Sequence, residues 1–204
     1  MDGIANIDQN YTCAAYSTNS SAIPVLIGAT ARLFNLSCGA TIAPSQTSAL
    51  PPAVVEHPFS LIPEDPLFPG GPTANMSGYH YFADATTPTF NLNMGSTQYG
   101  ITFSKLATKV AAPVNPLTNG FWPYTDPTDP DAPLVRNTTS VPWVKLTAQT
   151  APAVSEEMVS ENKGGVIEVY RINTAGGSPP KDCSKFPDGG HLELPYAAEY
   201  WFFA

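Results

Sequence analysis

The sequence predicts an all-β fold, a single antiparallel sandwich or barrel of about eight strands with two long proline-rich loops. Apolar side chains recur at every second position in several stretches, prolines gather between those stretches, and only 13% of the residues are charged. Undivided β domains commonly reach this length, so we expect residues 1–204 to form one secreted β domain.

Strands are expected where apolar residues alternate with other residues. The clearest alternation covers residues 25–34, and shorter ones cover residues 89–94 and 143–148. Further candidates are less regular, and the last two of them are apolar on both faces, which is typical of strands covered on both sides. These candidates are residues 11–16, 79–83, 99–106, 166–172 and 196–203.

Two segments are expected to be long loops. Residues 44–72 contain eight prolines and residues 113–142 contain seven. Proline fixes φ and lacks a backbone N–H, so neither segment suits a central strand. The only predicted helix is short, at residues 155–162.

Charge and hydropathy exclude two classes of partner. The chain has 9 basic and 17 acidic residues, a formal net charge of −8. Phosphate binding needs clustered Lys and Arg, so we expect no nucleic-acid partner. No apolar run approaches the ~18 residues that a membrane-spanning helix needs, so we expect no membrane span.

Several features favour secretion. Cysteines are few, and five Asn-x-Ser/Thr sequons occur where the Ser and Thr content gives roughly two by chance. Residues 1–4 lack the features of a signal peptide, so we expect a mature chain whose leader was replaced by a starting Met. A sequon-rich cytosolic protein is the alternative. The expected glycosylation sites of this extracellular glycoprotein are Asn10, Asn19, Asn35, Asn75 and Asn137.

Three cysteines allow one disulfide and leave one thiol over. A Cys13–Cys183 bond would close a very long loop, whereas a Cys13–Cys38 bond would join neighbouring segments. The residues alone leave both pairings open.

Four segments together resemble the fungal branch of the secreted family known as domain of unknown function 3455. The resemblance spans nearly the whole chain and implies a secreted fungal protein with no established activity. It also implies that Cys13 pairs with Cys183, although the chain lacks a cysteine that relatives carry within residues 113–120. The segments are Gln-Asn-Tyr-Thr-Cys at 9–13, Gly-Tyr-His-Tyr-Phe-Ala-Asp-Ala-Thr-Thr-Pro at 78–88, Val-Tyr-Arg-Ile-Asn-Thr-Ala-Gly-Gly-Ser-Pro-Pro at 169–180 and Tyr-Ala-Ala-Glu-Tyr-Trp-Phe-Phe at 196–203.

Members of this family are often labelled malate dehydrogenase, and this sequence does not support that label. A dinucleotide site needs Gly-x-Gly-x-x-Gly between a strand and a helix, with an acidic residue about 20 positions later. The chain has no such pattern and too few predicted helices for crossovers. We therefore expect no cofactor.

His80 is the first candidate for chemistry. It shares a strand face with Phe82 and Asp84, and with Asp84 it would form a base or a metal site if His57 or His191 supplied a third ligand. No metal-binding spacing supports this arrangement, so we expect no metal. A histidine hydrogen-bonded in a half-buried strand is the simpler interpretation.

Glu199 and Arg171 interrupt apolar strands, and buried charges need partners. We expect them to pair with each other, or Glu199 to pair with Arg32. The alternative is a Glu199 carboxylate at the base of a pocket. Glycosidase chemistry there would need a second inward acid, either Asp84 or Glu168.

The remaining candidates are turn and loop residues. Ser178 lies in a Gly-Gly-Ser-Pro-Pro segment and is expected to be turn material rather than a nucleophile. Aromatic residues at 121–124 would either plug the second long loop onto the sheet or form a platform for sugar rings. The residues predicted to bind a ligand are Tyr79, His80, Tyr81, Trp122, Tyr124 and Arg171.

Three functions remain in view. The leading hypothesis is a non-catalytic extracellular or cell-wall-associated protein that binds carbohydrate, a small apolar ligand or a host component. The second is a small hydrolase or metal-assisted enzyme centred on His80, Asp84 and Glu199. The third is a structural protein that associates with itself through its aromatic strands.

Overall fold

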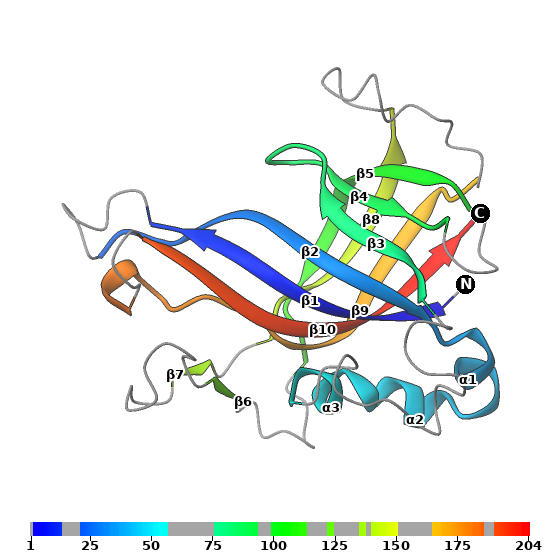
Figure 1. Ribbon diagram of the computed structural model, residues 1–204, viewed down its shortest axis with the longest axis horizontal. Helices are drawn as coiled ribbons and strands as arrows, with labels where there is room; N and C mark the ends of the chain where they lie inside the picture. The colour runs from blue at the N-terminus through cyan, green and yellow to red at the C-terminus, as the bar shows by residue number, and fades with distance from the viewer. Residues whose placement is uncertain are drawn as a thin grey trace.

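The computed structural model describes residues 2–13, 21–56, 76–93, 99–113, 122–124, 135–137, 140–150, 165–185 and 190–204. Eight strands in this part of the chain form a closed antiparallel barrel, so the all-β prediction is confirmed, with the barrel as the correct alternative (Figure 1). The barrel strands are β1 (Asp2–Thr12), β2 (Val25–Asn35), β3 (Met76–Phe82), β4 (Pro88–Asn91), β5 (Ile101–Val110), β8 (Trp143–Gln149), β9 (Glu168–Gly176) and β10 (His191–Phe203).

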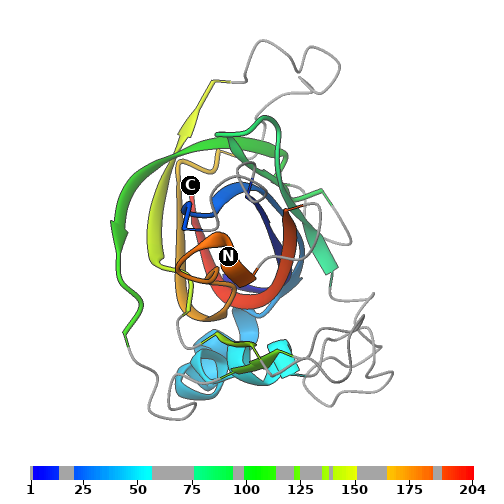
Figure 2. The ribbon, with the colours of Figure 1, turned by 90° about the vertical axis from the view of Figure 1, so that its left-hand side faces the viewer.

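The first strand closes the barrel against the last. The order around the barrel is β1-β10-β9-β8-β5-β4-β3-β2, and β1 pairs with β10 on one side and with β2 on the other. Figure 2 shows the strands as a ring in end view. Closure leaves no free sheet edge and separates a face that lines the interior from one that faces outward.

Apolar side chains fill one end of the interior. Leu33, Phe90 and Leu92 have no exposed surface, and Val169 and Phe202 are buried in the same cluster. Phe90 packs edge-on against Phe202, with ring centroids 5.4 Å apart. This packed end anchors the barrel, because burying such a side chain contributes roughly 1.5–3 kcal/mol.

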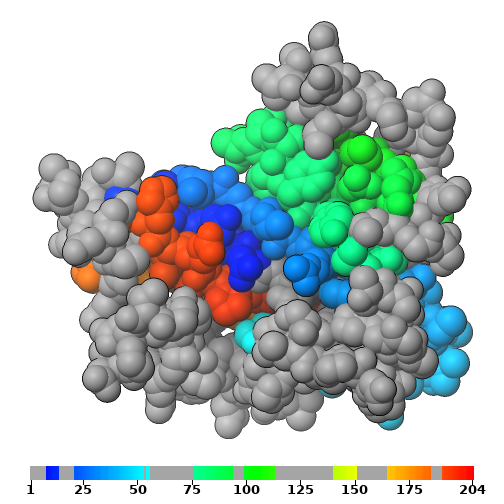
Figure 3. Space-filling model, viewed as in Figure 1, coloured from blue at the N-terminus to red at the C-terminus, as the bar shows by residue number. Residues whose placement is uncertain are grey.

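Three short helices lie outside the barrel (Figures 1 and 2). They are α1 (Ser37–Ile42), α2 (Pro44–Ser48) and α3 (Leu50–Glu56). Val54 of α3 is buried in a cluster with Phe34 of β2 and Ala197 of β10. Figure 3 shows the outer wall that β3, β2, β1 and β10 form.

The prediction of a loop from residue 44 onward was wrong for its first part, since α2 and α3 lie there. Pro44 occupies the start of α2, and Pro51 and Pro52 lie in the first turn of α3. The first turn of a helix does not use its backbone N–H groups, so prolines are tolerated there. The second predicted loop contains a separate two-stranded sheet outside the barrel, β6 (Trp122–Tyr124) with β7 (Val135–Asn137).

Two strands are longer than predicted. β1 begins at Asp2 rather than at residue 11, in a stretch where Ile4 and Ile7 do not follow a period of two. β9 continues to Gly176 rather than ending at residue 172. The helix predicted at residues 155–162 lies outside the described residues, and none of the helices described is long and apolar enough to cross a bilayer.

Gly78 marks a close approach of β3 to β4. A Cβ atom at this position would collide with the carbonyl oxygen of Asn91 and lie 2.8 Å from its carbonyl carbon. We expect Gly78→Ala to lower the free energy of unfolding by about 3 kcal/mol, because backbone atoms cannot move aside easily. Denaturant unfolding of the purified protein measures this.

Gly28 of β2 provides the matched control, because nothing lies within 4 Å of a Cβ atom built there. We expect Gly28→Ala to be neutral or to stabilise by about 0.5–1 kcal/mol. Equal unfolding midpoints for the two variants would contradict the close approach.

Candidate functional site

The unfilled end of the barrel holds a cavity of about 500 Å³. This volume lies within the range of small-molecule sites in proteins. The cavity reaches the surface, since Leu106 and Leu26 line it and are 55% and 40% exposed. Its apolar lining is Pro24, Leu26, Phe82, Pro88, Leu106, Val141, Pro142, Val144, Leu146 and Pro179, and its polar lining is Gln9, Tyr11, His80, Thr86, Lys109, Arg171, Ser178 and Tyr200.

Strand register places the polar groups in the interior. Arg171 of β9 lies between Tyr200 of β10 and Val144 of β8, and Val144 in turn lies opposite Lys109 of β5. Side chains directly opposite one another on adjacent strands share a face of the sheet. These four residues therefore form one row across four strands, and all four line the cavity.

The Arg171 guanidinium has neutral partners. One terminal nitrogen donates to the carbonyl oxygen of Pro142 at 2.9 Å, and the other donates to the hydroxyl of Tyr196 at 3.4 Å. The guanidinium also lies over the Tyr196 ring, 5.6 Å from its centroid. Burial opposes the charge, but the Tyr196 and Tyr200 hydroxyls hold the pKa of Arg171 above its ordinary value. The site therefore carries a fixed positive charge.

His80 of β3 is an uncharged group in the cavity wall. Its ring is 3% exposed and stacks on Phe90 with centroids 4.4 Å apart. Burial lowers the pKa of His80 to about 4, with a smaller contribution in the same direction from Arg171. Because Nδ1 lies 2.9 Å from the carbonyl oxygen of Thr89, which only accepts, the neutral ring carries its proton on Nδ1 and leaves Nε2 as an acceptor.

The rim of the cavity includes the segment that follows β9. Gly176 and Gly177 have φ values of 74° and 83°, and a Cβ atom on Gly177 would lie 2.7 Å from Cβ of Tyr196. Tyr11 donates a hydrogen bond from its hydroxyl to the carbonyl oxygen of Gly177 at 2.8 Å. Ser178 follows directly, so this residue belongs to the rim segment.

A disulfide holds the same segment. The structure joins Cys13, directly after β1, to Cys183 across 170 residues of sequence. Both cysteines are buried with Tyr11 and Leu194. Cys38 is a free, exposed thiol. The disulfide fixes the rim of the cavity to the end of the first strand.

The three catalytic candidates lie apart. His80 lines the cavity, whereas Asp84 lies in the β3–β4 turn and accepts hydrogen bonds from Thr86 and Thr87. These hydrogen bonds hold the pKa of Asp84 below its ordinary value. Glu199 is not among the cavity residues.

The prediction that Glu199 pairs with Arg171 or Arg32 was wrong. Its carboxylate accepts hydrogen bonds from Asn173 Nδ2 at 2.5 Å, Trp201 Nε1 at 2.9 Å and Ser48 Oγ at 3.3 Å. Alternation along β10 turns Glu199 to the outer face, opposite to Tyr200. The carboxylate therefore ties α2 and β9 to β10 through neutral donors.

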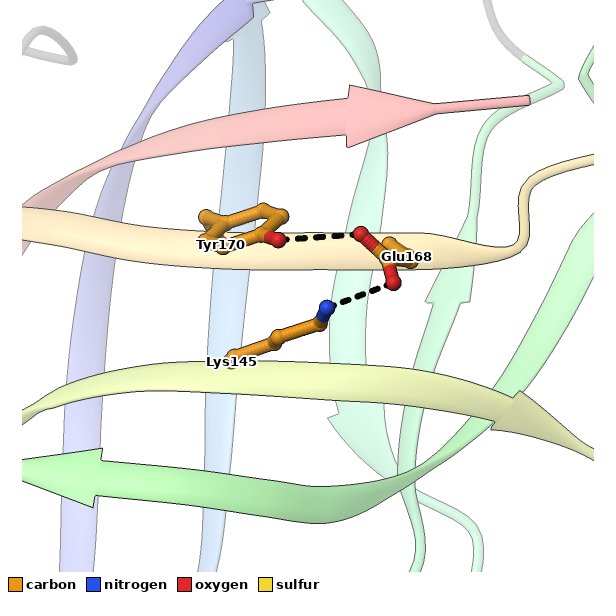
Figure 4. A network of polar contacts seen from close by, with 3 residues as sticks. All are labelled: Lys145, Glu168 and Tyr170. Atoms are coloured by element: carbon orange, nitrogen blue, oxygen red, sulfur yellow. Dashed lines mark hydrogen bonds and ion pairs between the residues drawn. The ribbon is translucent and has the colours of Figure 1, made fainter.

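Glu168, the other acid considered, also faces outward. Figure 4 shows its carboxylate between Lys145 Nζ, at 2.5 Å, and the Tyr170 hydroxyl, at 2.9 Å. Lys145 also lies over the Tyr170 ring. Hydrogen bonds from Lys145 and Tyr170 lower the pKa of Glu168. This cluster supports the outer wall of β8 and β9.

The predicted ligand-binding residues divide into three groups. His80 and Arg171 line the cavity. Tyr79 and Tyr81 alternate with His80 on β3, so they lie on the outer face, where Tyr79 is 38% exposed. Trp122 and Tyr124 belong to β6, outside the barrel, and their side chains lie outside what the structure describes.

The glycosylation sites remain predictions. Asn35 is exposed at the end of β2, Asn10 is partly buried on β1, and Asn137 lies in β7. Asn19 and Asn75 lie outside the described residues, as does His57.

Sequence reasoning missed most of the cavity lining. Gln9, Tyr11, Lys109 and Tyr200 were not singled out as binding residues, although β5 and β10 were expected as strands. One sequence feature could have identified such residues. Gln9 lies two positions before Tyr11, so a polar residue shares a strand face with an aromatic one. Assigning it to an interior cavity needed the barrel register.

Comparison with known proteins gives a family and no named relative. A family model described as protein of unknown function (DUF3455) matches residues 2–204. No curated protein and no solved structure matches the chain.

Among the described residues no group of three or more His, Cys, Asp or Glu side chains is placed to hold a metal ion.

Removing the disulfide tests its contribution to stability. We expect Cys13→Ala combined with Cys183→Ala to lower the free energy of unfolding by about 2–5 kcal/mol, because the bond restricts the unfolded chain. Cys38→Ala is the control and should leave the denaturant midpoint unchanged, since this thiol is exposed and unbonded. A double variant as stable as the control would contradict this contribution to stability.

The pH dependence of stability tests His80. The pKa of His80 is about 4 in the folded protein, against an ordinary value of 6.5 in the unfolded chain. Between pH 6.5 and pH 4, the imidazole therefore takes up a proton in the unfolded chain but not in the folded protein. His80 therefore makes the free energy of unfolding fall as the pH drops from 6.5 to 4, by about 3 kcal/mol in total. We expect denaturant unfolding of His80→Gln from pH 7 to 4 to lack this part of the slope.

His191 lies exposed at the start of β10 and serves as the control. His191→Gln should keep the slope of the unsubstituted protein. If His80→Gln also keeps it, the ring is not held neutral in the wall of the cavity.

Proposed function

The chain belongs to the DUF3455 family of proteins of unknown function, and we propose that it is a non-catalytic binding protein for a small, largely apolar molecule. The observation that carries the proposal is the cavity of about 500 Å³ at one end of the barrel. A site of this size encloses most of the surface of a small organic ligand.

The lining favours an apolar ligand over a carbohydrate. Ten of its residues are aliphatic, aromatic or proline, and Leu26 and Leu106 leave large apolar surfaces exposed. Hydrating such surfaces is unfavourable, and a ligand that covers them gains roughly 25 cal/mol per Å².

The separation of the catalytic candidates argues against the hydrolase alternative. That alternative needs His80, Asp84 and Glu199 in one pocket, and only His80 lines the cavity. A neutral imidazole without a carboxylate partner lacks the orienting group of nucleophilic triads. The cavity therefore supports binding better than bond cleavage.

Secretion and glycosylation complete the proposal. The Cys13–Cys183 disulfide fits an oxidising compartment, and five sequons fit a glycoprotein. We place the chain in the fungal branch of the family, as a single extracellular domain over residues 1–204. The ligand would come from the cell wall, the surroundings or a host.

A bulky substitution inside the barrel tests the site. Leu106 of β5 lines the cavity. We expect Leu106→Trp to weaken binding of the neutral fluorescent probe N-phenyl-1-naphthylamine at least tenfold, because the larger indole side chain would occupy part of the cavity volume. Fluorescence titration measures the dissociation constant.

Thr108→Trp is the matched control. Thr108 lies opposite Lys145, which faces outward, so this substitution adds the same side chain to the outer wall. Binding should be unchanged. Absence of probe binding in the unsubstituted protein, or equal loss in both variants, counts against the cavity as the site.

A further inference from the structure

We propose that the cavity selects amphipathic molecules with an oxyanion head group, and that Arg171 binds this head group. The inference rests on the proposed function, since it names the chemistry of the ligand for the same cavity. The charge and the hydrogen bonding of the lining carry it.

Arg171 lacks an anionic partner. Its hydrogen bonds go to the carbonyl oxygen of Pro142 and the hydroxyl of Tyr196, and no carboxylate of the described residues lies within ion-pair distance. The Nε–H group is buried and has no hydrogen-bond acceptor. A guanidinium has five N–H donors in a planar fork that matches an oxyanion, so donor capacity remains.

Neighbouring tyrosines do not supply the missing charge. Burial raises the pKa of Tyr200 well above its ordinary value, and burial also raises the pKa of Tyr11. Both hydroxyls are therefore protonated at neutral pH. Tyr11 donates its hydrogen bond to the carbonyl oxygen of Gly177. The Tyr200 hydroxyl, 3.1 Å from that of Tyr196, could donate to an oxyanion.

A second cation lies in the same row of side chains. Val144 is opposite Arg171 on one side and Lys109, an exposed residue, on the other, so the Cα atoms of the two basic residues are separated by two strand spacings, roughly 10 Å. The cavity lining contains Lys109 and Arg171 but no Asp or Glu. This positive charge lies in a chain of net charge −8, so the cavity differs in sign from the protein as a whole.

The apolar lining favours a hydrocarbon tail on the ligand. Leu26, Leu106 and Leu146 lie in the same cavity as the two cations, and each offers aliphatic surface. A head group at Arg171 would leave a hydrocarbon tail against these side chains. The structure therefore fits a single-chain carboxylate or a similar oxyanion amphiphile.

Three single-chain probes with nearly equal hydrocarbon tails and different head groups separate the possibilities. They are decanoate, decan-1-ol and decyltrimethylammonium, titrated below their micelle concentrations at neutral pH by displacement of N-phenyl-1-naphthylamine. We expect decanoate to bind at least tenfold more tightly than decan-1-ol, as a charge-assisted hydrogen bond implies, and the cation to bind most weakly. Added salt should reduce the preference for decanoate.

Variants assign the preference to residues. Arg171→Met should lose the preference for decanoate over decan-1-ol, whereas Arg171→Lys should keep part of it. Lys109→Met should reduce the preference severalfold. Lys105→Met is the matched control, because Lys105 is an exposed residue of the same strand that does not line the cavity.

Each outcome decides a separate claim. Equal binding of decanoate and decan-1-ol overturns the oxyanion proposal and leaves the apolar site standing. If none of the probes binds, both proposals fail. If Arg171→Met does not fold, the preference of the unsubstituted protein, its partial retention in Arg171→Lys and its reduction in Lys109→Met but not in Lys105→Met still decide the matter.

Discussion

Pairing of the first strand with the last is the constraint on which the cavity depends. The register from Asp2 opposite Trp201 to Thr12 opposite His191 runs the length of β1, so the sheet closes without a free edge. Closure and register together fix which pairs of opposite side chains point inward. Without closure, Arg171 and Lys109 would lie on an open sheet rather than in one row along the cavity wall.

The interior is divided between packing and binding. Phe90, Leu92 and Phe202 fill one end with aromatic and aliphatic side chains, and the cavity occupies the other. His80 lies at the boundary between the packed end and the cavity, where its ring stacks on Phe90 and lines the cavity. A rigid packed end holds the binding end in shape, because close-packed interiors are stiff.

The rim is organised by elements far apart in sequence. Gly177 approaches Tyr196 too closely for any side chain, Tyr11 bonds to its carbonyl group, and Cys183 is bonded to Cys13. Each contact connects the segment after β9 to β1 or β10. The glycines, the tyrosine and the disulfide therefore act together on the position of Ser178 and the adjoining proline.

The strand-rich architecture can be predicted from the order of the residues alone, because a period of two is a local property of an extended chain, clearest in β2. The same order also marks His80 and Arg171 as unusual, since each is a polar residue within an apolar strand. Their roles depend on the folded barrel. Glu199 and Tyr200 are adjacent in sequence and lie on opposite faces of β10, one bonded to neutral donors outside the barrel and one lining the cavity. Which face becomes the interior depends on barrel closure and register, which involve contacts between residues as distant as β1 and β10 and have no local signature.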